Sequence, residues 1–315
     1  MNQPIQHEID RRGFLAAMGV AAAGQGLSPA GFAKEPADGD AFELRYMLAS
    51  CMYGFADLSD VLVEVPKVGS KAIDLWPKKH GNQREQLDEM GEERFAELLA
   101  EHEVTLGCLT RYHADPEILQ GEMRLAQRLK CPLVVSAAKG LPDIDDKSIK
   151  GYLQHFFDEW KPQIAVAEEC GVTLALENHG GNPIDSPDSL RWFVELRPSK
   201  HIALALSPYY LEQDGEQIAQ IVRDTGEGIA LFYAWQHGLG SKQKRPLEEE
   251  LLQMPGRGPL DFGPIVEALR DINYRGWTEI FMHPYPRGRP ILPTIDQTTA
   301  EINRSRSYLA KGLKN

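Results

Sequence analysis

The chain has 315 residues, of which 42% are hydrophobic, and a formal net charge of -12 at pH 7. The length suits either two average domains or one α/β barrel of about 250 residues. The negative charge and the lack of a basic stripe argue against binding to nucleic acid, because phosphate contacts need clustered Lys and Arg. We expect a polar small molecule as the partner.

The first 33 residues differ in character from the rest. Arg11 and Arg12 lead into a run of small residues that ends near Ala33. This pattern resembles a twin-arginine export signal, and a disordered basic terminus is the alternative. We expect a signal peptide over 1–33, a linker over 34–42 and export, for example to the periplasm. The apolar part is too short and too weak for a stable membrane span.

Eight short β-like runs follow the linker and alternate with segments whose apolar residues recur at helical spacing. Strands joined by helices are parallel, and no GxGxxG follows the first run, so the pattern predicts a single-domain (β/α)8 TIM barrel over 43–315. The runs are Leu44 to Ala49, Lys71 to Trp76, Val104 to Leu109, Pro132 to Ser136, Val172 to Leu176, His201 to Leu206, Ile229 to Trp235 and Trp277 to Met282.

Five of the nine histidines lie at or just beyond the ends of these runs. The carboxyl ends of the strands in such a barrel share one rim, where barrel enzymes keep their active sites, so we expect these imidazoles to converge there. They are His80, His113, His179, His237 and His283.

Glu177 is the strongest single candidate for a functional residue. It ends the run VTLALE, and a carboxylate at the end of a buried strand needs a cation, a proton or several donors to compensate it. Asn178 and His179 follow it and indicate a polar pocket that contacts substrate. A structural Glu that is fully hydrogen bonded is the alternative.

His237 and His283 extend this candidate site. Neutral imidazoles and a carboxylate bind Mn, Zn, Co or Fe with positions left open for substrate, so Glu177, His237 and His283 form a predicted divalent-metal site. Either histidine alone is more often a hydrogen-bonded rim residue than a ligand.

Aromatic and polar residues from other strand ends suit a sugar, because aromatic rings stack on sugar faces while Arg and His donate to hydroxyls. For Trp76 and Trp235, packing within the barrel is the alternative. For Arg287, which lies in the Pro-rich final segment, the alternative is a place in an exposed surface loop. The candidates are Trp76, His80, Arg111, His113, Trp235 and Arg287.

Three features together resemble the xylose-isomerase-like barrel family, which includes sugar phosphate isomerases and epimerases. They are the segment ALENHG, the order of eight strands, and GxGxxDF before the last helix and strand. The resemblance runs from Leu44 to the C-terminus. It implies a divalent metal held by Glu, Asp, His and Glu after strands five to eight.

Only two of those four metal positions match. Glu177 fits the first and His237 the third, whereas Ser207 stands where Asp is expected. Glu279 comes too early in its strand, so the alternation of side chains leaves His283 at the rim. His179 and His283 are the residues that would substitute.

We therefore expect an exported sugar isomerase or epimerase that abstracts a proton next to a carbonyl, with Glu177 and His283 as base and acid and with a divalent metal. The alternatives are a keto-glycoside lyase that uses the same site and a non-catalytic sugar-binding protein derived from the enzymes. The sequence leaves the sugar, its phosphorylation and the oligomeric state open.

Overall fold

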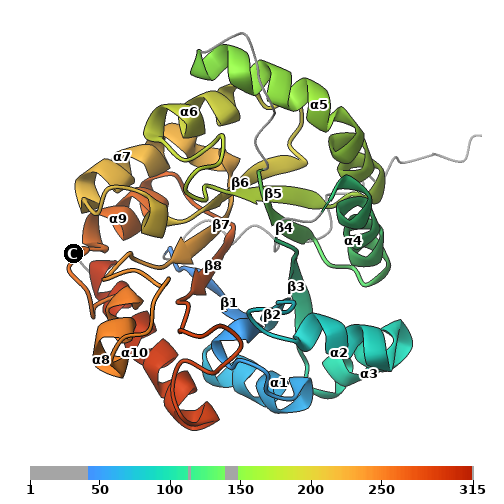
Figure 1. The fold of residues 1–315 in the computed structure, drawn as a ribbon, viewed down its shortest axis with the longest axis vertical. Helices are drawn as coiled ribbons and strands as arrows, with labels where there is room; N and C mark the ends of the chain where they lie inside the picture. Colours follow the sequence, from blue (N-terminus) through green and yellow to red (C-terminus); the bar gives the residue numbers. More distant parts are fainter. Residues whose placement is uncertain (1–41, 113–114, 139–147, 314–315) are drawn as a thin grey trace, which may run out of the picture.

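The computed structural model describes residues 42–112, 115–138 and 148–313. The predicted signal peptide and nearly all of the predicted linker lie outside these residues. Eight parallel strands form a closed barrel in the order β1 to β8, and β8 pairs with β1 (Figure 1). The strands are β1 Arg45–Ala49, β2 Ala72–Leu75, β3 Thr105–Thr110, β4 Leu133–Ala137, β5 Thr173–Glu177, β6 Ile202–Leu206, β7 Ile229–Ala234 and β8 Trp277–Ile280.

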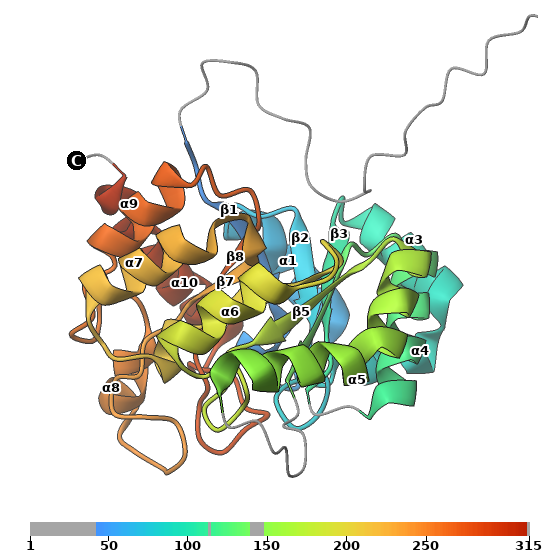
Figure 2. The ribbon, with the colours of Figure 1, turned by 90° about the horizontal axis from the view of Figure 1, so that it is seen from above.

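Helices form a ring around the barrel, as Figures 1 and 2 show from two directions. The short helix α8 lies in the long connection between β7 and α9. The helices are α1 Leu58–Lys67, α2 Gln83–Met90, α3 Glu92–Glu101, α4 Pro116–Arg128, α5 Ile149–Cys170, α6 Pro187–Leu196, α7 Gly215–Thr225, α8 Leu247–Glu250, α9 Gly263–Asp271 and α10 Ile295–Gly312.

The predicted (β/α)8 barrel is confirmed, and each predicted run contains or overlaps its strand. Every residue of β2, β4, β5, β6 and β7 is buried. This is the expected condition of parallel strands with helices outside and side chains inside, and it explains their nearly continuous apolar sequence.

Local signals in the sequence begin and end the helices between the strands. Ser148 accepts a hydrogen bond from the Gly151 amide at the start of α5, and Asp214 accepts from two amides at the start of α7. Gly171 ends α5 in the left-handed conformation, which a residue without Cβ adopts most easily. All eight strands are parallel, and Figure 1 looks onto their carboxyl ends.

The four cysteines, Cys51, Cys108, Cys131 and Cys170, are free and buried. Three of them are fully enclosed, and burial raises the pKa of each of those thiols. Among the described residues, no helix has the length and apolar content to cross a membrane.

Candidate functional site

A cavity of about 390 Å³ opens at the carboxyl end of the barrel. This is where active sites of barrel enzymes lie, and the volume suits a small molecule. Its walls come from segments that follow six different strands. The lining residues are Trp76, Pro77, Lys78, Lys79, His80, Tyr112, His179, Tyr209, Tyr210, Ser241, Lys242, His283 and Arg287.

Two of the predicted histidines meet in this cavity. The Nδ1 atoms of His80 and His283 lie 3.2 Å apart, and the ring centroids are 4.3 Å apart. Burial lowers the pKa of His283 well below its ordinary value, and the nearby His80 and Arg287 lower it further. His283 is therefore a neutral imidazole at pH 7. The edge of the His283 ring also faces Trp76, with 5.8 Å between ring centroids.

Glu177 is the last residue of β5 and is 2% exposed. Its Oε2 atom is buried and has no hydrogen-bond partner among the described residues. Burial raises the pKa of this carboxyl to about 8, although the nearby Ser207 hydroxyl acts in the opposite direction. Burial also raises the pKa of Tyr210, which lines the cavity, and the charge of Glu177 adds to that effect. Glu177 itself is not among the residues that line the cavity, but its carboxyl lies close enough to the lining residue Tyr210 to act on the pKa of that phenol.

Asn178 differs from the predicted substrate contact. It is fully buried, its Nδ2 donates to the Ser207 carbonyl at 3.0 Å, and its Oδ1 accepts from the Ser207 amide at 2.6 Å. Each polar atom of the side chain therefore makes a bond that joins the ends of β5 and β6, and the buried side chain is not part of the cavity wall. Asn178 positions the backbone next to Glu177.

The two predicted tryptophans have different roles. Trp76 lines the cavity and stacks against Phe281 and Tyr112, with centroid distances of 5.0 and 5.9 Å. Trp235 is 1% exposed, stacks on Tyr209 at 3.8 Å, and is not among the residues that line the cavity. Trp76 is therefore part of the cavity wall, whereas Trp235 packs within the barrel.

His179 lines the cavity, whereas His237 lies to one side of it. His237 is exposed, and its ring centroid is 4.9 Å from that of Tyr209. It lines a neighbouring hollow of about 550 Å³ that shares His179, Tyr209 and Tyr210 with the cavity. The His179 ring packs on Tyr210, with 4.4 Å between centroids.

The predicted metal site does not form in this structure. Among the residues that the structure describes, no three or more His, Cys, Asp or Glu side chains are grouped so as to hold a metal ion. The His283 ring lies against His80, whereas His237 is exposed and its ring packs beside Tyr209. The donor set Glu177, His237 and His283 therefore does not fit a divalent metal.

Arg111 is also placed differently from the prediction. Its Nε lies 3.7 Å from Glu122, which is bonded to the buried Arg84, and Arg111 does not line the cavity. Tyr112, the next residue, lines it instead. His113 falls outside the described residues.

Sequence reasoning missed a pair of carboxyl groups inside the barrel. Asp74 and Glu279 are fully buried, and the Asp74 carboxylate accepts from the Thr110 hydroxyl at 2.6 Å. Neither oxygen of Glu279 has a hydrogen-bond partner among the described residues, and a hydrogen bond between the two acids requires a proton on one of them. Burial raises the pKa of Asp74 to about 7, and burial together with Asp74 raises that of Glu279 well above its ordinary range.

The only available sequence signal for this pair was the one that identified Glu177, namely a carboxylate in an apolar strand. Asp74 interrupts the strand Ala72–Leu75, and Glu279 interrupts Trp277–Ile280. Glu279 lies below the rim, as the alternation along its strand predicts.

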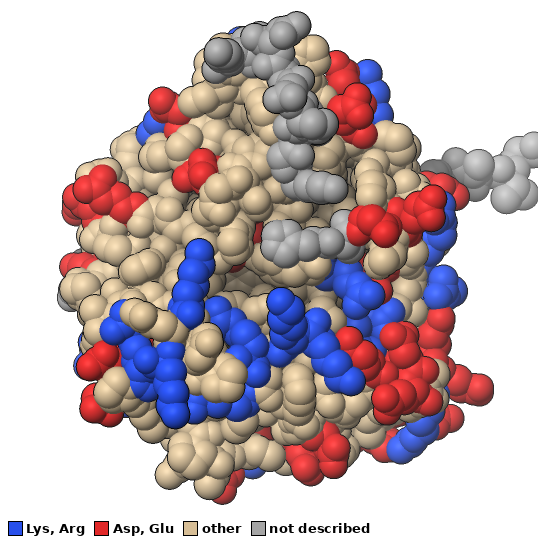
Figure 3. All heavy atoms as spheres, viewed as in Figure 1, with Lys and Arg blue, Asp and Glu red and all other residues tan. Residues whose placement is uncertain are grey.

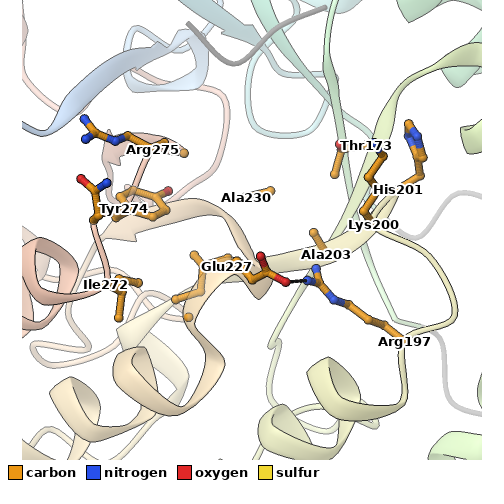
Figure 4. Close-up of a pocket in the computed structure, with 14 residues that line it drawn as sticks. Thr173, Arg197, Lys200, His201, Ala203, Glu227, Ala230, Ile272, Tyr274 and Arg275 are labelled. Carbon is orange, nitrogen blue, oxygen red and sulfur yellow. Dashed lines mark hydrogen bonds and ion pairs between the residues drawn. The ribbon is translucent and has the colours of Figure 1, made fainter. Parts of the chain in front are cut away.

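A second hollow of about 310 Å³ lies at the opposite, amino end of the strands (Figure 4). Its floor includes Ala203, Ala230 and Tyr274, and Arg197 at its edge is paired with Glu227 at 3.2 Å. It contains none of the predicted site residues, and active sites of barrel enzymes lie at the other end.

The fold and the cavity define a TIM-barrel protein with a cavity of small-molecule size at the carboxyl ends of its strands. Residues 62–308 match the family described as xylose isomerase-like TIM barrel, and the chain belongs to that family. Over 113 residues it is 27% identical to the D-psicose 3-epimerase of Enterocloster bolteae. This match covers 35% of the chain and 33% of that relative, so the chain spans about a third of the relative's length.

Solved structures share the fold at low sequence identity. A structure of L-ribulose 3-epimerase is 17% identical, with a TM-score of 0.64, and the match covers 86% of this chain and 95% of that one. The IolI protein with a bound zinc atom is 17% identical, with a TM-score of 0.59, and the match covers 85% and 96% of the two chains. At such identities the likeness establishes the fold.

Proposed function

We propose that the protein is a sugar isomerase or epimerase that removes a proton from the carbon next to a carbonyl. The observation that carries this proposal is Glu177, a buried carboxyl at the end of β5 whose Oε2 has no hydrogen-bond partner among the described residues. A buried acid that lacks hydrogen-bond partners is typical of a catalytic group, and Glu177 lies close to Tyr210, which lines the cavity. The family and the epimerases among its similar proteins support the same reaction.

Glu177 is proposed as the base. With a pKa of about 8, it both accepts and releases a proton near neutral pH, so in an isomerisation it takes the proton from one carbon and delivers it to the next. In an epimerisation a second group returns the proton from the opposite face. His283 is proposed as the acid at the carbonyl oxygen. A neutral imidazole donates one N–H to a developing oxyanion, and this role requires that His283 accepts from His80 through Nδ1 and keeps its proton on Nε2.

The walls of the cavity suit a sugar. Trp76, Tyr112, Tyr209 and Tyr210 present aromatic rings, while His80 and Arg287 supply polar groups. Rings stack on the C–H face of a sugar, and polar groups bind its hydroxyls.

The proposed reaction uses only groups of the chain itself. The residues predicted to bind a divalent metal do not fit one, so no step is assigned to a metal. A non-catalytic sugar-binding protein is the second candidate function. It is favoured by Ser207, which stands where the resemblance implies an Asp ligand. A lyase that begins with the same proton removal remains compatible with these residues.

Turnover of a sugar panel tests the proposal. Ketohexoses and aldohexoses are incubated with the protein, and new isomers are separated by chromatography. The wild-type protein should convert at least one sugar, and Glu177→Gln should lower the rate at least about 10³-fold with binding retained. Glu227→Gln, an exposed acid at the opposite end of the barrel, is the matched control and should retain full activity. Binding without conversion by the wild type would favour the sugar-binding protein.

We also propose that the chain is exported through its N-terminal residues. Arg11 and Arg12 and the small-residue run after them support this. In cell fractionation, the wild-type protein should leave the cytoplasm and lose about 33 residues. A variant with both Arg11→Lys and Arg12→Lys should stay unprocessed inside the cell. Equal export of the two forms would contradict the proposal.

A further inference from the structure

Cationic side chains line the cavity at the barrel mouth. Lys78 and Lys79 follow β2, Lys242 lies in the segment after β7, and Arg287 lies in the segment after β8. No Asp or Glu is among the described residues that line the cavity. The cavity therefore has an excess of positive charge.

This local charge contrasts with that of the whole chain, whose net charge is -12. In Figure 3, Lys and Arg side chains gather along one side of the central hollow, whereas acidic side chains lie mostly toward the periphery. Clefts with charge of one sign concentrate ligands of the opposite sign and increase their rate of association. The distribution of charge favours an anionic ligand at this site.

Arg287 supplies geometry in addition to charge. Its Nη1 donates to the carbonyl oxygens of Ser241 and Pro284 at 2.8 and 2.7 Å, and its Nη2 donates to the Ser241 hydroxyl at 3.0 Å. These bonds use three of the five N–H groups of the guanidinium and hold it in place. Nε–H and the second Nη2–H have no acceptor among the described residues.

Those two remaining donors lie on one edge of the planar guanidinium. Parallel N–H groups on one edge match the two oxygens of a carboxylate or a phosphate. Arg287 therefore combines a fixed position at the cavity wall with a free pair of donors for an anion, and Lys242 adds a second positive charge on the same wall.

We propose that the substrate of this site is an anionic sugar, with a carboxylate or a phosphate on its carbon chain. Arg287 binds the anionic group through its free edge, Lys242 adds to the attraction, and the aromatic walls contact the sugar. The sugar part of this inference rests on the proposed function, whereas the anionic part rests on the lining of the cavity.

Binding calorimetry on matched sugars tests the inference without requiring turnover. The probes are D-fructose, D-fructuronate and D-fructose 6-phosphate, together with D-glucose, D-glucuronate and D-glucose 6-phosphate. At least one anionic sugar should bind tenfold or more tightly than its neutral parent. Arg287→Lys keeps the charge but loses the paired donors, so it should weaken binding of the preferred anionic sugar. The probe that binds more tightly, the uronate or the 6-phosphate, identifies the anionic group.

Lys242 provides a second variant in case Arg287 is needed for folding. Lys242→Gln should reduce the preference for the anionic sugar at least threefold. Lys244→Gln removes the same charge from an exposed residue of the same segment that does not line the cavity, and it should leave the preference unchanged.

Three results would overturn the inference: neutral sugars that bind as tightly as the anionic ones, no binding by any probe, or equal effects of the two lysine variants. A preference for anionic sugars without turnover would leave the inference intact and count against the proposed isomerase. Turnover of neutral sugars without a preference for anionic ones would support the proposed isomerase and overturn the inference.

Discussion

The Nδ1 atoms of His80 and His283 lie 3.2 Å apart at the wall of the cavity. A hydrogen bond between these two atoms requires that one ring donates and the other accepts. If His283 accepts through Nδ1, its Nε2 carries the proton that the proposed reaction needs. We assign this tautomer to the pair, so that the contact between strand ends far apart in the sequence places the proton of the proposed acid on Nε2.

This relationship predicts how the two histidines depend on each other. His283→Gln should lower kcat by about 10²–10⁴-fold because the proton donor is lost. His80→Gln should have a smaller effect, and adding it to His283→Gln should lower kcat little further, since its role acts through His283. Steady-state kinetics of the single and double variants measure this. His155→Gln, an exposed histidine of α5, is the control. Additive losses would show that the two rings act independently.

The acid pair inside the barrel predicts a pH-dependent stability. The pKa of Asp74 is about 7 in the folded state and about 4 in an unfolded chain. The folded protein therefore keeps this proton while the unfolded chain loses it, so the contribution to stability is full below about pH 4 and falls as the pH rises to about 7.

Glu279→Gln should reduce that loss, because an amide can donate to Asp74 without having to keep an acidic proton. We expect a free energy of unfolding about 1–3 kcal/mol above that of the wild type at pH 8, and a much smaller difference at pH 4. Urea unfolding at both pH values gives these differences. A variant that is less stable than the wild type at pH 8 would show that the buried acid pair does not destabilise the folded protein at that pH.

Asn178 should matter for stability more than for substrate affinity. Asn178→Ala removes two hydrogen bonds to the backbone of Ser207 and leaves that amide and carbonyl unsatisfied. A loss of about 2 kcal/mol in the free energy of unfolding is expected. Gln243→Ala, at an exposed residue with no such bonds, should change it by less than about 0.5 kcal/mol. A stable Asn178→Ala protein with a greatly raised KM would restore the substrate contact that the sequence suggested.

Removal of metal should have little effect on the protein. Because the described residues provide no group of donors for a metal ion, dialysis against a chelator should leave both the melting temperature and the turnover rate unchanged. Elemental analysis of protein purified without chelator gives the metal content. One Mn, Zn, Co or Fe per chain, together with loss of activity on dialysis, would contradict this reading of the site.

The barrel and the position of Glu177 could be predicted from the sequence because both depend on local patterns. Apolar runs separated by helical segments define the strands, and the chain between parallel strands must return to the end of the sheet at which the previous strand began. Glu177 is the residue at which such a run ends, so its burial follows from its place in the strand.

The interactions around the site could not be predicted in the same way. Asn178 is bonded to the backbone of Ser207, 29 residues away, and nothing in either segment indicates that pairing. Trp235 and His237 follow β7 at positions where the backbone turns, so strand alternation no longer gives the direction of their side chains. Asp74 and Glu279 are single acids in β2 and β8, the two strands on either side of β1, and their pairing depends on their heights in those strands.

Solvent deuterium exchange tests the central claim most directly. A sugar that the protein converts is incubated in D₂O, and deuterium at the carbon next to the carbonyl is followed by NMR in both substrate and product. The wild type should introduce deuterium at that carbon, and Glu177→Gln should do so at least about 10³-fold more slowly while binding the sugar equally well. Conversion without deuterium uptake, or equal uptake by Glu177→Gln, would contradict proton removal by this residue.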